Sequence, residues 1–356
     1  MTDSGNLSID FLVGFTIFLM AFIWVATMIP GLLIGLQANS IDYTAVAYRT
    51  GVILVEDPGW PASPPWESYA DFAKSNVSRF GLAISKETPN ILSDDKVNRF
   101  FCLSTTDPSV GFVYPDDYRS RAIFGDVRYN FNISLRDTDA NLTRMIGSVL
   151  PKNYGYIRRV VKIKSISNAT IDQRKIALFH YNNTDGNVTR HEFSILFNNT
   201  KLLGDVTNPL YQIDPARERT IVNITDWKYF MSANPATTTV TLMNVTIYKL
   251  DPSGLSSFAG ISPNQFVYTD GNRSRVDQLP IVVNNNISIQ LSPYLFTQIN
   301  AQYAKVFINL TFNLTTPSTF INTTNNPNAS PFDYNYYSDN VTQPRLRDAV
   351  VEVAVW

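Results

Sequence analysis

The feature that most constrains this chain is an uncharged apolar segment near its N-terminus. The 26 residues from Phe11 to Leu36 contain no Asp, Glu, Lys or Arg, and 20 of them are apolar. As a helix, this segment would be about 39 Å long at ~1.5 Å per residue, whereas the hydrocarbon core of a bilayer is ~30 Å thick. The segment therefore predicts a membrane-spanning helix. The roughly 300 residues after it are enough for one large domain or two smaller ones.

A cleaved secretory signal peptide is the alternative for the same segment. Ala45-Val46-Ala47 offers a small-residue cleavage site. However, a signal peptide has an apolar region of ~7–15 residues that follows a basic start. This segment is longer, and residues 1–10 contain no Lys or Arg. We therefore expect an anchor that is retained.

The residues before the apolar segment carry a processing motif. Gly5 and Asn6 are followed by Ser8 and Asp10. This run resembles the class III signal peptide of archaeal type IV pilin-like proteins, in which a prepilin peptidase removes a short leader and leaves the apolar helix on the mature protein. The resemblance implies cleavage after Gly5, with Asn6, Ser8 and Asp10 at the Gln, Ser and Glu positions of the family pattern. The leader lacks the usual basic residue, and Gly14 stands where the family has Leu.

Asp10 places a carboxylate at the edge of the apolar helix, where an unpaired charge is costly if it enters the bilayer. The resemblance implies that it pairs with the new α-amino group of a neighbouring subunit. Alternatively, Asp10 faces the aqueous interface, where an acid at a helix N-terminus is favourable.

A second block of residues supports the same resemblance. It contains, in order, Pro58-Gly59-Trp60-Pro61, Pro65-Trp66-Glu67, Gly81-Leu82-Ala83, Asn90-Ile91-Leu92-Ser93 and Lys96-Val97. This order is similar to the start of archaeal class III pilin-like surface proteins, and the resemblance covers about residues 1–100. It implies three partners: a prepilin peptidase, like subunits or other pilins that contact the N-terminal helix, and membrane lipid.

We expect four segments along the chain. They are a leader over residues 1–5, a hydrophobic membrane or filament helix over 6–56, a Pro/Trp corner with a short helix over 57–101, and a β-rich extracellular head over 102–356, with a possible boundary near 204–217. Pro58-Gly59 is a turn signal that ends the long helix.

Single residues in the corner also carry expectations. Trp60 and Trp66 are expected to pack the corner onto the head. Ser93, followed by two acids, predicts the start of the short helix. Cys102 follows an apolar run and is expected to be buried.

Beyond the corner, the apolar pattern changes to period two. In Ala304–Thr315, apolar residues alternate with Asn and Thr, which predicts a half-buried strand. The same reasoning predicts strands at Ile157–Ile166, Arg174–Tyr181, Thr189–Phe197, Arg219–Ile224, Thr238–Leu250, Ile281–Leu291 and Leu346–Trp356. We therefore expect an α+β chain, in which a long N-terminal hydrophobic helix precedes a mainly antiparallel, β-sandwich-type extracellular head.

The Asn-x-Ser/Thr sequon occurs 17 times, about three times more often than the composition gives by chance. The sequon at Asn6 begins the membrane helix and should remain unmodified. The candidate glycan acceptors are Asn76, Asn132, Asn141, Asn168, Asn182, Asn187, Asn198, Asn223, Asn244, Asn272, Asn286, Asn309, Asn313, Asn322, Asn328 and Asn340. Acceptors lie outside the cytoplasm, so the head is expected outside and the first ten residues inside. Alternatively, an Asn- and Thr-rich β-surface produces sequons that carry no sugar.

The composition excludes several kinds of chemistry. A net charge of −1 leaves no basic surface for nucleic acid. The chain has one Cys and two His, and it contains no P-loop, dinucleotide or nucleophile-elbow motif. If Asp185-Gly186 forms a two-residue turn, His180 and His191 face each other across a hairpin, either as a metal pair or as a surface pair that binds nothing. We expect no enzyme activity and no cofactor, and N-linked glycans as the modification.

Three functions fit these observations. The first is a type IV pilin-like cell-surface subunit, a minor or tip pilin because its head is large, with a glycosylated head for adhesion. The second is a membrane-anchored extracellular adhesin or binding protein of the cell envelope that never assembles. The third is an anchored extracellular hydrolase. In each, the chain is held at the cell surface by its N-terminal helix or is part of an extracellular filament, with the C-terminal head outside.

Overall fold

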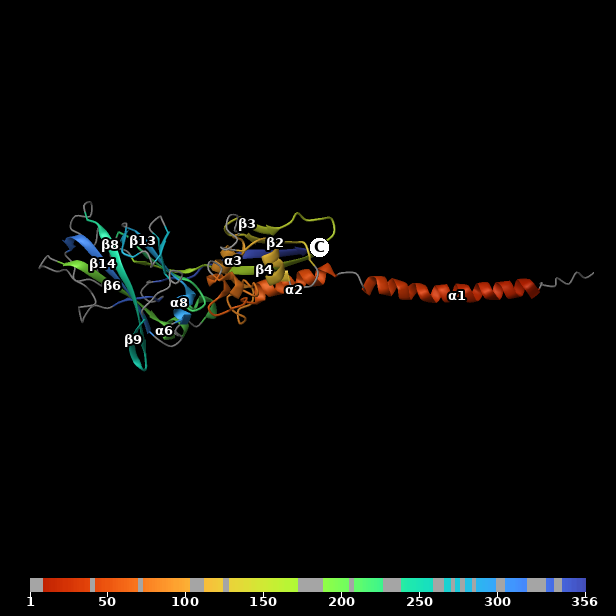
Figure 1. The fold of residues 1–356 in the computed structure, drawn as a ribbon, viewed down its shortest axis with the longest axis horizontal. Helices are drawn as coiled ribbons and strands as arrows, with labels where there is room; N and C mark the ends of the chain where they lie inside the picture. Colours follow the sequence, from red (N-terminus) through yellow and green to blue (C-terminus); the bar gives the residue numbers. More distant parts are fainter. Residues whose placement is uncertain are drawn as a thin grey trace, which may run out of the picture.

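The computed structural model of the chain describes residues 9–38, 42–69, 73–102, 112–123, 128–171, 188–204, 208–226, 238–258, 266–269, 273–275, 279–283, 286–298, 305–318, 331–335 and 341–356. The structure is mixed α/β. An apolar N-terminal helix extends away from a β-rich body that has a part near the helix and a part far from it (Figure 1).

Two helices are long among the described residues. They are α1 (Ile9–Ala38) and α2 (Tyr43–Glu56). The shorter helices and single turns are η1 (Trp66–Ser68), η2 (Lys74–Asn76), α3 (Asp94–Phe100), α4 (Asp116–Tyr118), η3 (Arg119–Ile123), α6 (Asn199–Gly204), η4 (Pro209–Tyr211) and α8 (Pro293–Gln298).

The prediction of one uninterrupted helix over residues 6–56 is wrong, because a new helix begins at Tyr43. Asp42 has non-helical backbone angles (φ −80°, ψ 85°). Its carboxylate accepts hydrogen bonds from the backbone N–H groups of Thr44 and Ala45, at 3.0 and 3.1 Å. A carboxylate in this position satisfies amides that the helix leaves unpaired. The local sequence thus starts α2 independently of α1.

The proximal domain, which we define as residues 42–164 and 346–356, is built on a five-stranded sheet in the order β1-β4-β17-β2-β3. The strands are β1 (Ile91–Ser93), β2 (Phe131–Asp137), β3 (Leu142–Gly147), β4 (Gly155–Lys164) and β17 (Leu346–Val355). The β1–β4 pair is parallel, and the other pairs are antiparallel. Helix α2 packs on β4 and β17 and buries Ala47 and Leu54 completely.

The distal domain, which we define as residues 167–342, contains two six-stranded sheets. One has the order β11-β10-β13-β7-β5-β16, and the other has the order β12-β8-β14-β6-β15 with β9 paired to β8. Apolar residues from both sheets form one buried cluster. The strands are β5 (Ser167–Ile171), β6 (Val188–Asn198), β7 (Thr220–Ile224), β8 (Val240–Asp251), β9 (Gly254–Phe258), β10 (Phe266–Thr269), β11 (Arg273–Arg275), β12 (Ile281–Val283), β13 (Ile287–Leu291), β14 (Lys305–Ser318), β15 (Phe332–Asp333) and β16 (Val341–Thr342).

The distal domain is inserted between two neighbouring strands of the proximal sheet. β4 ends at Lys164, and β17 begins at Leu346, opposite Lys164 in the antiparallel register. The chain therefore leaves the proximal domain and returns to it at one place. The boundary predicted near 204–217 is wrong, because Leu202 and Val222, on either side of it, are buried in the same cluster.

Most of the predicted strands are confirmed. β4, β6, β7, β8, β14 and β17 lie where the period-two pattern predicts them. In β14, the side chains of Val306, Ile308 and Leu310 are fully buried, as the alternation requires. The prediction of one strand over Ile281–Leu291 is wrong, since β12 pairs with β8 and β13 pairs with β7 in a different sheet. The segment Arg174–Tyr181 lies outside the described residues.

Candidate functional site

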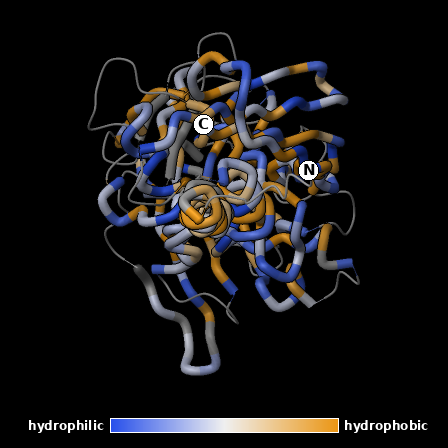
Figure 2. The backbone as a smooth tube through the Cα atoms, turned by 90° about the vertical axis from the view of Figure 1, so that its right-hand side faces the viewer, coloured by the Kyte–Doolittle hydropathy of each residue, from blue (hydrophilic) through white to orange (hydrophobic). Residues whose placement is uncertain are grey.

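Helix α1 is apolar around its whole circumference. Within Phe11–Ile29, a stretch of 19 residues, 0% is buried against the rest of the described chain. Large side chains such as Phe18 and Trp24 are 64% and 65% exposed. In the view along this helix, its turns are mostly hydrophobic (Figure 2). A helix that is apolar on all sides belongs in a bilayer or a protein core, and 19 residues extend about 28 Å at ~1.5 Å per residue. α1 thus fits a membrane anchor or a signal sequence.

The two hydroxyl groups in this stretch are satisfied within the helix itself. Thr16 Oγ1 donates to Leu12 O, and Thr27 Oγ1 donates to Trp24 O, each at 2.8 Å. A polar group without a partner is expensive in hydrocarbon. The two threonine hydroxyls of Phe11–Ile29 are therefore already paired with backbone carbonyls of the same helix.

The predicted processing motif lies at the start of this helix. Gly5, Asn6 and Ser8 are outside the described residues. Asp10 lies in the described part of α1, which covers Ile9–Ala38, and the role of its carboxylate stays a prediction.

The first turn of α2 lies directly against the sheet. Gly155, at the start of β4, touches the backbone of Tyr43, and a Cβ on this glycine would overlap the Tyr43 carbonyl. Further along α2, the Arg49 guanidinium donates to Ile123 O at 3.0 Å. The starts of α2 and β4 are therefore side by side, and α2 is fixed to the domain at the end from which α1 is reached.

The motif residues of the corner converge on Lys96. Its Nζ donates to Pro58 O and to Ala83 O, each at 2.8 Å, and the residue is 1% exposed. Trp66 is completely buried, and its Nε1 donates to Gly81 O at 2.7 Å. Residues that are up to 38 positions apart in the chain thus form one structure beside the C-terminal end of α2. Its visible role is to hold that helix in place.

Glu67 is buried near Lys96 and is 6% exposed. Its Oε2 has no hydrogen-bond partner among the described residues. Burial raises the pKa of Glu67 to about 7, and the Lys96 ammonium offsets this only in part. Burial likewise lowers the pKa of Lys96, against the attraction of Glu67. The corner therefore contains a carboxyl group that titrates near neutral pH.

The expectations for the other corner residues are confirmed in part. The short helix is present as α3, but the Ser93 side chain makes no capping hydrogen bond. Trp66 is buried as expected. Trp60 is 58% exposed, because it occupies an edge bridge to Arg79 rather than the core. The prediction that Cys102 is buried is wrong: it is exposed, since α3 and its apolar face end before it.

Nine of the sequon asparagines in the described residues have exposed or partly exposed side chains. The exposed ones are Asn76, Asn141, Asn244, Asn286 and Asn313, and the partly exposed ones are Asn168, Asn198, Asn223 and Asn309. Six further candidates are outside the described residues: Asn182, Asn187, Asn272, Asn322, Asn328 and Asn340.

Asn132 conflicts with its predicted role as a glycan acceptor. It is 8% exposed, and its Nδ2, the atom that would carry the sugar, donates to Ser148 O at 2.9 Å. Its position in β2, next to β17 and β3, explains this burial. A buried and hydrogen-bonded amide is not accessible to a transferase, so we remove Asn132 from the acceptor set.

The predicted histidine pair is not resolved by the structure. His180 lies outside the described residues, and His191 is in β6, opposite Phe312 of β14. Within the described part of the chain, no group of three or more His, Cys, Asp or Glu is placed to hold a metal ion.

A cavity of about 300 Å³ lies between the two domains. Lys164 in its wall donates to both carboxylate oxygens of Glu218, at 2.9 and 2.8 Å. Asp214 faces Arg217 at 3.3 Å, and burial raises the pKa of its carboxyl group. Of these two ion pairs, Lys164–Glu218 joins the proximal domain to the distal domain, whereas Asp214–Arg217 lies within the distal domain.

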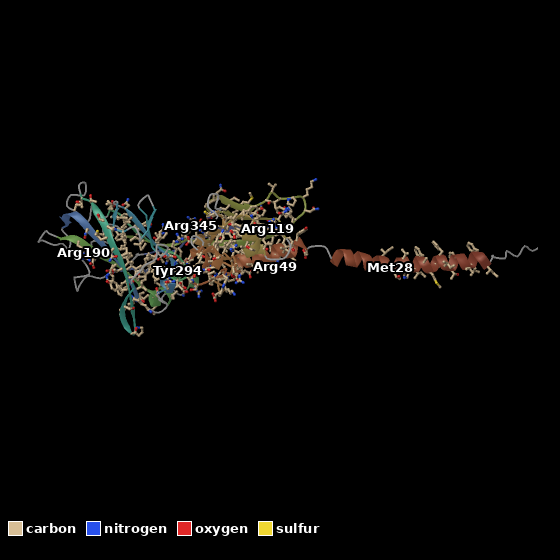
Figure 3. The ribbon with its side chains drawn as sticks, viewed as in Figure 1. Met28, Arg49, Arg119, Arg190, Tyr294 and Arg345 are labelled. Carbon is tan, nitrogen blue, oxygen red and sulfur yellow. The ribbon has the colours of Figure 1, made fainter. Side chains whose placement is uncertain are left out.

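The domain contact has two further pairs. Arg219 Nε lies 2.9 Å from Asp95 Oδ2. The rings of Tyr69 and Tyr294 meet edge to face with centroids 5.6 Å apart, and Tyr294 is labelled between the two domains in Figure 3. None of these pairs was predicted, since each joins residues far apart in the chain and no local pattern marks them.

Comparisons with known proteins give one relative. An uncharacterized protein of Archaeoglobus fulgidus is 38% identical over 89 residues, which are 24% of this chain and 45% of that protein. The match thus spans less than half of the relative's length. No protein-family model matches the chain, and no solved structure matches it.

Proposed function

We propose that this chain is a type IV pilin-like cell-surface subunit, a minor or tip pilin with a glycosylated head for adhesion or surface interaction. Its partners would be a prepilin peptidase, membrane lipid around α1 before assembly, and like subunits or other pilins around α1 afterwards. The head would lie outside the cell, and the distal domain would be a β-sandwich, since its two sheets share one buried cluster.

The observation that carries the proposal is the contrast between α1, which is uncovered, and α2, which is packed on the head. α1 is apolar on all sides and finds no cover within the described chain. It therefore needs lipid or the helices of other subunits around it. α2, by contrast, is capped by Asp42 and packed on the proximal sheet. A helix whose apolar surface must be covered by lipid or by other subunits is thus followed in the chain by a helix that belongs to the folded head.

The distribution of sequons supports an outward distal domain. Of the 17 sequons, 13 fall within residues 167–342. This domain is also the part farthest from α1 (Figure 1). Glycans there would hydrate a surface that is poor in charge, while the helix and most of the proximal domain remain free for contact with other subunits.

The N-terminus of the mature protein tests the proposal. We expect mass spectrometry of the chain, isolated from cells that contain a prepilin peptidase, to find Asn6 as the first residue. The variant Gly5→Val should retain the leader, because the residue before the cut is enlarged. The matched control Gly14→Val, with open space around this glycine, should be cleaved normally. A wild-type chain that still begins at Met1 or Thr2 would instead support an anchored adhesin that never assembles.

A further inference from the structure

One end of the proximal domain collects exposed apolar, aromatic and basic side chains. The antiparallel registers place Phe131, Gly155 and Val355 opposite one another at this end of the sheet, with Gly147 next to Asn132. The segments that flank these residues are 128–130 and 148–154. We call this region the anchor-facing end.

The apolar residues of this end are unusually exposed. Val149 is 92% exposed and Leu150 is 45% exposed, in the segment that joins β3 to β4. The segment is held by Ser148, whose N–H donates to Phe131 O at 2.9 Å. Neighbouring apolar side chains that are held in water in this way favour contact with another apolar phase.

Aromatic and basic residues surround this apolar pair. Tyr43 and Tyr154 are 36% and 39% exposed. Lys152 and Arg128, in the two flanking segments, are both exposed. Tyr rings prefer the boundary between water and lipid, and Lys and Arg are attracted to anionic headgroups. Asp42 is a nearby carboxylate, and its side chain caps α2.

The chain itself fixes how far this end can lie from the membrane. The apolar segment ends at Leu36, and Tyr43 at the start of α2 lies against Gly155. Asp42 is six positions after Leu36, so the tether is no longer than about 20 Å at ~3.3–3.6 Å per residue. A surface held this close to a bilayer meets it at a high effective concentration.

We infer that the anchor-facing end is a lipid-docking surface, on which Val149 and Leu150 enter the headgroup region while Lys152 and Arg128 contact anionic headgroups. This inference rests on the membrane-anchored state of the proposed function. Docking would hold the body upright on its anchor, with the distal domain away from the bilayer (Figure 1).

Site-specific quenching in vesicles tests this surface. The full chain, with its exposed Cys102 replaced by Ser, is reconstituted into vesicles of phosphatidylcholine and phosphatidylglycerol. A fluorophore is attached at Val149→Cys, or at the matched control Val282→Cys, which is 61% exposed in the distal domain. We expect quenching by a headgroup-attached spin label to be at least threefold stronger at 149 than at 282, and to weaken when phosphatidylglycerol is left out.

A third label, at Phe18→Cys in α1, separates the two claims. Quenching at 18 by an acyl-chain spin label, with equal quenching at 149 and 282, would overturn the docking surface and leave the anchor standing. No quenching at 18 would overturn both. A signal at 149 that follows the protein-to-lipid ratio instead of the quencher lipid would assign this end to contact with a second copy, and it would overturn lipid docking as well.

Discussion

At the scale of single residues, the corner shows how buried charge is used in this chain. Lys96 lies in a position where two backbone carbonyls accept its hydrogen bonds, so its ammonium group is solvated by the protein itself. Glu67 has an oxygen without a partner in the described residues. A buried pair of this kind favours one geometry but contributes little net stability.

The stability of the folded chain is predicted to fall as the pH rises from about 4.5 to about 7. The unfolded chain releases the Glu67 proton near 4.5, and the folded chain retains it up to a pKa of about 7. The unfolded state therefore binds fewer protons in this window, and it is favoured as the pH increases. Glu67→Gln removes this titration, so thermal unfolding at pH 4.5 and 7 should show a smaller loss of Tm for the variant. The exposed Asp116→Asn should behave like the wild type, and equal pH dependence in E67Q would contradict the assignment.

Glycan occupancy is predicted to follow side-chain exposure. Asn313 and Asn244 are exposed on β14 and β8, whereas Asn132 is buried. Glycopeptide mass spectrometry of the native protein should find sugar at one or both of the exposed positions, and Asn313→Gln or Asn244→Gln should each remove the corresponding mass. No sugar should be found at Asn132. Sugar at Asn132 together with bare Asn313 and Asn244 would show that exposure does not govern the modification.

At the scale of elements, the helices and strands that could be predicted from the sequence are those with a regular pattern of apolar residues. α1 follows from its apolar run, and β14 follows from alternation that leaves Ile308 and Leu310 fully buried. Phe131–Asp137 alternates in the same way and is the strand β2, although it was not among the predicted strands. The start of α2 is capped by one side chain, Asp42, and a single capping residue leaves no periodic pattern in the sequence. Short strands such as β16 carry too few residues for a pattern.

Closer packing at Gly155 is predicted to loosen α2 from the sheet. A methyl group there would overlap the Tyr43 carbonyl, and backbone cannot rotate away as a side chain would. Gly155→Ala should therefore lower the free energy of unfolding by about 1–3 kcal/mol, as overpacking does. Gly204→Ala is the matched control, because no atom lies within 4 Å of the added Cβ. Thermal unfolding of the two variants makes the comparison, and equal Tm values would refute the close contact.

At the scale of the whole molecule, the distal domain is an insertion between β4 and β17. The proximal domain is thus complete only when the last strand returns, after the whole distal domain has been made. No local pattern in the sequence encodes this topology, because it depends on pairing between strands whose partner residues are 182 to 200 positions apart in the chain. For the same reason, contacts between the domains, such as Lys164 with Glu218, could not be predicted from local sequence patterns.

Loss of the Lys164–Glu218 pair between the domains is predicted to lower the stability of the folded chain. Both side chains are largely buried, at 3% and 12% exposure. Lys164→Met leaves a carboxylate without its partner, and such a change costs about 3–5 kcal/mol. The double variant K164M/E218Q should recover much of that loss, because no uncompensated charge remains. Calorimetric unfolding compares the stability of K164M with that of K164M/E218Q. A double variant less stable than K164M would contradict the explanation by an uncompensated charge.

The proposed function requires that α1 assembles this chain into a surface filament. Purified cell-surface filaments, from cells that express the wild type or the uncleaved Gly5→Val variant, test it directly by quantitative mass spectrometry. We expect peptides of this chain in wild-type filaments, with Asn6 as the first residue, and at least a tenfold loss of those peptides in G5V filaments. The chain present only in the membrane fraction, in equal amounts for both strains and never in filaments, would contradict the claim.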